Sequence, residues 1–142
     1  MPSLSQMGAE GVLRWVSSWP TVWGMEVAAA LTNQPHLLWD SVAGHCTAMH
    51  SWPDALADEA CRRVAGAGVQ VVTNPRDNIV LQGRGDRYPK RRGLTRVDEL
   101  WAAGAMVGIG HDSVVDPWYR LGTANMRDPA YMLVLAGHLT GE

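Results

Sequence analysis

Three short apolar runs, each ending at a polar side chain, place the strongest limit on the fold of this chain. The runs occupy residues 41–45 (SVAGH), 69–74 (VQVVTN) and 105–112 (AMVGIGHD). Segments of helical character follow them at 52–68, 94–104 and 123–141. Strands that alternate with helices at this spacing predict an α/β fold with three consecutive parallel βα units.

The connections set the expected boundaries of these elements. Pro75 ends the second strand, because it has no N–H to offer a neighbouring strand, and a long loop is predicted for 76–93. Thr95 is the predicted N-cap of the second helix, with Asp98 in a capping-box position. Gly104 is the predicted residue that ends this helix.

Polar residues stand at the ends of all three predicted strands, at His45, Asn74 and Asp112. In parallel α/β folds the carboxyl ends of the strands meet at one edge, where ligands and catalytic groups gather. Alternation along the third strand puts Gly108 and Gly110 on the same face as Asp112, which leaves space beside its carboxylate. The sequence therefore predicts a site that contains His45 and Asp112.

Three stretches around these strand ends resemble one enzyme family. They are GHCTAMHS (44–51), NPRDNIVLQGRGDRYPKRRGLTRVDEL (74–100) and GIGHDSVVDPWYRLGTANM (108–126). Their order and spacing resemble the last three βα units of cytosine deaminase-like members of the amidohydrolase superfamily. The likeness runs from about Val42 to Asn125, and residues 1–40 show none. It implies that residues 41–142 form the C-terminal portion of a TIM-like (β/α)8 barrel.

The resemblance also implies a chemistry and the residues that carry it. The family uses one divalent metal, iron or zinc, to activate water that attacks the C–NH2 carbon of a heterocycle. His45 matches the site histidine of the sixth strand and is expected to be catalytic. Asp112 matches the metal-binding aspartate of the eighth strand and is expected to bind the metal and take a proton. Trp118 matches the aromatic wall of the substrate pocket, which suits a flat ring.

Two departures from the family pattern shape the expected function. Ser113 stands where the family has an aspartate that binds the substrate, so the expected substrates widen to other cyclic amidines or lactams of pyrimidine or triazine type. The five histidines form no His-x-His pair, and a lone Asp112 is too few ligands for a catalytic metal. The chain is expected to be a truncated amidohydrolase that does not retain metal and is inactive alone. The alternative is a non-catalytic α/β binding or assembly module.

The first forty residues differ from the rest in composition. They hold four of the seven tryptophans and only four charged residues, and Pro20 interrupts the helical spacing of Trp15, Trp19 and Trp23. One interpretation is a helix pair with tryptophans at its core or at an interface. The other is a Trp-rich segment, helical or irregular, that is foreign to the barrel and arose from a displaced start or a frameshift.

Charge and cysteine content limit the partners and the compartment. A net charge of −2 gives no general attraction to nucleic acid, although six of the twelve basic residues lie in 84–96. That run is expected to cap the barrel mouth or to pack on a neighbouring subunit, with nucleic-acid binding the minor alternative. Unpaired strand edges predict self-association. No membrane span is expected, and Cys46 and Cys61, without CxxC spacing, favour the reducing cytoplasm.

Overall fold

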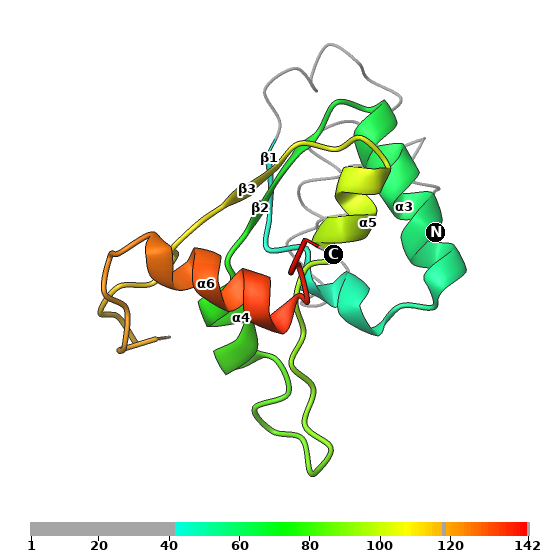
Figure 1. The fold of residues 1–142 in the computed structure, drawn as a ribbon. Helices are drawn as coiled ribbons and strands as arrows, with labels where there is room; N and C mark the ends of the chain where they lie inside the picture. Colours follow the sequence, from blue (N-terminus) through cyan, green and yellow to red (C-terminus); the bar gives the residue numbers. More distant parts are fainter. Residues whose placement is uncertain (1–41, 118, 142) are drawn as a thin grey trace, which may run out of the picture.

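The structure, a computed structural model, describes residues 42–117 and 119–141. Its elements in chain order are β1 (Val42–Gly44), the 3-10 helix η3 (Thr47–Ser51), α3 (Asp54–Gly66), β2 (Gln70–Thr73), α4 (Pro75–Leu81), α5 (Val97–Ala102), β3 (Val107–Ile109) and α6 (Arg127–Ala136). The strands form one parallel sheet in the order β1-β2-β3, which confirms the predicted βα units (Figure 1). The predicted segment 1–40 lies outside the described residues.

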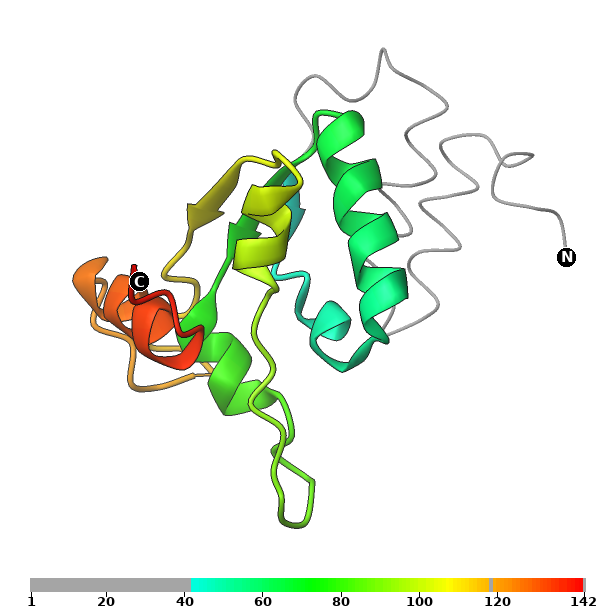
Figure 2. The ribbon, with the colours of Figure 1, turned by 45° about the vertical axis from the view of Figure 1, so that its right-hand side comes forward.

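One face of the sheet packs against α3 and α5, which lie side by side in both views (Figures 1 and 2). Val71 of β2 is buried there with Val64 of α3 and Leu100 of α5, and each is at most 1% exposed. Ala43 and Val107, the partners of Val71 in the register, pack against the same core. Apolar residues on alternate strand positions therefore hold the sheet to these two helices.

The opposite face carries alternate residues that are far more exposed. Val42 of β1 is 56% exposed, and Met106, just before β3, is 68% exposed. On the same face, two positions further along the strands, Gly44, Val72 and Gly108 are paired side by side. Within the described part of the chain, the sheet is thus covered by helices on one face.

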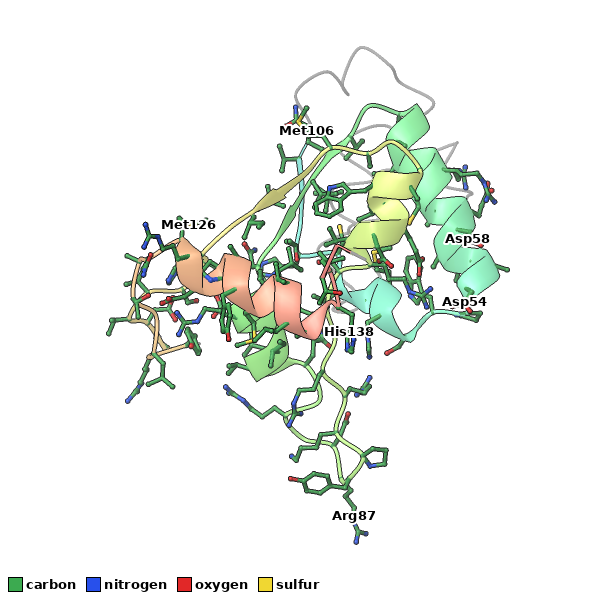
Figure 3. The ribbon with its side chains drawn as sticks, viewed as in Figure 1. Asp54, Asp58, Arg87, Met106, Met126 and His138 are labelled. Carbon is green, nitrogen blue, oxygen red and sulfur yellow. The ribbon has the colours of Figure 1, made fainter. Side chains whose placement is uncertain are left out.

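The helix α4 is a correction to the loop predicted for 76–93. Pro75 occupies the first turn of α4, where its missing N–H costs nothing and its fixed φ suits the helix. The same residue that ends the second strand therefore also begins a helix. After Leu81 the chain forms a long loop that projects from the sheet, with Arg87 at its tip (Figure 3).

The predicted cap of α5 is also wrong. Arg96 is the N-cap, and no side chain caps this helix. The Thr95 hydroxyl instead lies 2.7 Å from the Thr73 hydroxyl and donates to the carbonyl of His45. Gly104 follows the C-cap with φ 89°, as the predicted stop requires. Among the described helices, none is both long and apolar enough to cross a membrane.

Candidate functional site

The chain turns sharply after β1 and so brings His45 to the carboxyl end of the sheet. His45 and Cys46 both have left-handed backbones, with φ of 63° and 51°. Such a backbone is uncommon outside glycine, so neighbouring contacts must hold it. The His45 amide donates to the carbonyl of Val72 at 2.8 Å, and the His45 carbonyl accepts from Thr95. Both contacts fix the position from which the imidazole projects.

The imidazole of His45 meets three polar side chains. Its Nδ1 lies 2.9 Å from Oδ1 of Asn78, on α4. Its Nε2 lies 3.3 Å from Nδ2 of Asn74 and 3.2 Å from Oδ2 of Asp112. The ring is half exposed, and the Asp112 side chain is 33% exposed. The structure thus brings together the residues that end all three strands.

Nε2 of His45 has a hydrogen-bond partner in either protonation state. When it carries a proton it can donate to the Asp112 carboxylate, and when it does not it can accept from the Asn74 amide. Nδ1 lies against the Asn78 amide oxygen and donates to it when Nδ1 is protonated. The arrangement can therefore hold a proton at Nε2 or pass it on, as a general acid or base requires.

Asp112 reaches this position by a turn rather than by the predicted strand alternation. The strand β3 ends at Ile109, and Asp112 has a φ of 62°, so the pleat does not set its direction. The space at Gly110 is taken by its neighbours, since a Cβ there would collide with the side chains of Asn74 and Val72. The glycine at 110 lets Asn74 approach the turn that carries Asp112.

Asp77, on α4, is a buried carboxyl beside Asp112. It is 1% exposed, and its Oδ2 accepts the Ser113 amide at 2.8 Å. Burial raises the pKa of Asp77, and the nearby charge of Asp112 raises it further. Its Oδ1 has no hydrogen-bond partner among the residues that the structure describes. Asp77 and Asn78 were hidden from the sequence analysis because they fell in the predicted loop, although Pro at a first helical position was a signal for α4.

Ser113 and Trp118 are the two residues expected to contact the substrate. Ser113 is buried, and its backbone amide is committed to Asp77. Trp118 lies outside the described residues. Arg76, the residue before Asp77, ties α4 to the segment that follows the site, because its guanidinium lies 3.0 Å from Asp128 and 2.7 Å from the Tyr119 hydroxyl.

The described side chains do not fit a metal centre. Over residues 42–117 and 119–141 there is no group of three or more His, Cys, Asp or Glu side chains placed to hold a metal ion. Asp112 and His45 come together as a pair. A catalytic metal normally needs at least three protein ligands, so this pair is an incomplete set.

The match to a family model decides the family. The model of the amidohydrolase family matches residues 24–142. The chain belongs to the amidohydrolase family. The match begins before residue 41, where the motifs placed the start of the barrel domain. It extends over every described element of this amidohydrolase, including all three strands and the His45–Asp112 pair.

Similar proteins of known activity are deaminases and related hydrolases. The pterin deaminase of Rhizobium rhizogenes is 37% identical over 81 residues, which are 56% of this chain and 18% of that protein. The crystal structure of 5-methylcytosine deaminase from Klebsiella pneumoniae, liganded with 5-fluorocytosine, has a TM-score of 0.75 at 35% identity. The alignment covers 81% of this chain and 28% of that one.

A more distant structure shares the fold. The N-isopropylammelide isopropylaminohydrolase of Burkholderia multivorans has a TM-score of 0.63 at 18% identity, over 85% of this chain and 28% of that one. The amidohydrolase described here thus spans less than a third of the length of these relatives. The predicted resemblance to cytosine deaminase-like amidohydrolases, and to part of their barrel, is confirmed.

Proposed function

We propose that this chain supplies the His45–Asp112 half of a hydrolytic deaminase site that acts on an amino-substituted heterocycle. The observation that carries the proposal is the 3.2 Å contact between His45 Nε2 and Asp112 Oδ2 at the carboxyl end of the sheet. The deaminase relatives support the reaction class, because one acts on pterin and one on 5-methylcytosine. Flat nitrogen heterocycles with an exocyclic amine are the substrates that these names share.

The chemistry assigned to the pair is proton transfer. Hydrolytic deamination adds water to a ring carbon and releases ammonia, so a proton must leave the water and another must reach the amine. His45 can hold a proton at Nε2 and Asp112 can accept one at Oδ2, each within reach of the other. In this proposal Trp118 stacks on the ring, and Ser113 contacts the substrate at the position where the resemblance implies an aspartate.

The metal is the part of the site that this chain does not complete. Amidohydrolases generally use a divalent metal, and the resemblance implies iron or zinc. Asp112 is the residue proposed to bind it, but the described side chains fall short of a ligand set. We therefore propose that the remaining ligands come from outside the described residues, and we derive no reaction step through the metal.

Partners and compartment follow from the same features. The sheet face that the described helices leave uncovered, and the edges at β1 and β3 in the described sheet, favour association with further βα units, including self-association of this chain. Cys46 and Cys61 are both free and buried, which fits a reducing compartment such as the cytoplasm. A second candidate function is a non-catalytic α/β module, and the incomplete ligand set favours it.

Ammonia release by the purified chain tests whether its half-site suffices for catalysis. The substrates are cytosine, a pterin and an aminotriazine, each with ferrous or zinc ion, and Asp112→Ala is the matched variant. The incomplete ligand set predicts no release above the level of Asp112→Ala. Metal-dependent release that Asp112→Ala abolishes would contradict this and make the chain a complete deaminase.

A further inference from the structure

The helix α4 contacts both halves of the candidate pair through two consecutive residues. Asn78 lies against Nδ1 of His45 at 2.9 Å, and Asp77 accepts the amide of Ser113 at 2.8 Å. Ser113 directly follows Asp112. Asp77 and Asn78 are 1% and 3% exposed, so neither helix residue is free to turn outward, and the bond from Ser113 to Asp77 is buried.

We infer that Asp77 and Asn78 of α4 are positioning residues, which fix the tautomer of His45 and the turn that carries Asp112. Asn78 acts through its contact with His45, and Asp77 acts through the turn that carries Asp112. The inference deepens the proposed function and rests on it for its catalytic meaning. The hydrogen bonds themselves can be measured on the chain alone, so they can fail independently of any activity.

The tautomer follows from the chemistry of the amide. Oδ1 of Asn78 only accepts, so its hydrogen bond to His45 forms when Nδ1 carries the proton. Nδ2 of the same amide is buried and has no partner among the described residues. In the neutral ring Nε2 is then unprotonated and points at the site, where Asn74 and Asp112 lie. A base that is to take a proton at Nε2 needs this tautomer. Without Asn78, an imidazole exposed to water would favour the proton on Nε2.

The turn at Asp112 needs a similar support. Asp112 has a left-handed backbone, which costs energy in a residue with a Cβ. The buried Asp77 carboxyl accepts the next amide in the chain and so resists a return of this turn to an extended path. Arg76 anchors the same helix to Asp128 and Tyr119, which keeps α4 from moving away from the turn. Figures 1 and 2 show α4 at the end of β2, beside α6.

The first experiment measures the tautomer of His45 by NMR of the ring nitrogens, with Asn78→Asp and Asn78→Leu as variants. Wild type and Asn78→Asp keep an acceptor at position 78, so when the ring is neutral its proton should lie on Nδ1 in both. Asn78→Leu should lower the share of that tautomer several-fold in favour of Nε2–H. Asn125→Leu is the control, because Asn125 bonds Arg127 and Asp128 rather than His45.

A neutral ring with its proton on Nε2 in wild type, or an unchanged tautomer in a folded Asn78→Leu, would overturn the inference. The Val71 amide, bonded to Met106 across the sheet at 2.9 Å, reports whether each variant is folded. If Asn78→Leu loses protection at Val71, wild type and Asn78→Asp still decide, because the inference requires Nδ1–H in both.

The second experiment measures hydrogen exchange at the Ser113 amide in Asp77→Asn and Asp77→Leu. The asparagine keeps an acceptor for this amide and should retain most of its protection. The leucine removes the acceptor, so this amide should exchange roughly tenfold faster or more. Equal exchange rates at Ser113 in wild type and a folded Asp77→Leu would show that Asp77 does not hold the turn.

Discussion

At the residue scale, the positions of the strand ends predicted that His45 and Asp112 lie together, but not which residues of α4 contact them. His45 and Asp112 were predictable because each ends an apolar run, and parallel strands bring such ends together. The contacts of Asp77 and Asn78 were not predictable, because they depend on where α4 sits against the turn at Asp112. Trp118 and the ligand role of Asp112 stay predictions.

Asp77 should make the stability of the fold depend on pH in an unusual direction. Burial raises the pKa of Asp77 in the folded protein above its unfolded value of about 3.9. The stability that Asp77 contributes is therefore fully present below the unfolded pKa and is lost as pH rises through the folded pKa. Asp77→Asn removes this ionisation. Urea unfolding from pH 4 to 7 should show the variant gaining stability relative to wild type as pH rises. If the free energy of unfolding of Asp77→Asn relative to wild type stays constant or falls from pH 4 to 7, the raised pKa of Asp77 is contradicted. Asp58→Asn, at an exposed position, is the control.

At the element scale, the regular βα units were predictable and the helix α4 was not. The three strands, α3, α5 and α6 follow from apolar runs and glycine stops that are readable in the sequence. The helix α4 has seven residues, too few for a repeating apolar face, and Pro75 was interpreted only as the end of a strand. Its position depends instead on tertiary contacts with α6.

Arg76 is the contact that should hold α4 to α6. Its side chain is 15% exposed and bonds Asp128 at 3.0 Å and the Tyr119 hydroxyl at 2.7 Å. Arg76→Met keeps the apolar stem and removes these bonds, so the free energy of unfolding should fall by about 1–3 kcal/mol. The exposed pair of Arg62 and Glu59 gives the control, since Arg62→Met should change it by less than about 0.5 kcal/mol. If the two substitutions change the free energy of unfolding in urea equally, the bonds of Arg76 do not hold α4 to α6.

At the scale of the whole molecule, the sheet and its candidate site correspond to part of the barrel of larger relatives. One sheet face is covered by α3 and α5 (Figure 1). On the other face, Val42 and Met106 are exposed in the described structure. The relatives align over about 28% of their length in the two solved structures. The family match supplies the reason for this open face, because a barrel interior is filled by layers of side chains from all its strands.

The central claim is that His45 and Asp112 form one half of a deaminase site, and complementation in trans tests it most directly. The 5-methylcytosine deaminase of Klebsiella pneumoniae would be produced without the segment that aligns with this chain, then combined with this chain or with Asp112→Ala. We predict that wild type restores metal-dependent release of ammonia from 5-methylcytosine and that Asp112→Ala does not, although both co-purify with the shortened enzyme. A co-purifying wild-type complex that releases no more ammonia than the Asp112→Ala complex would contradict the claim and favour the non-catalytic module.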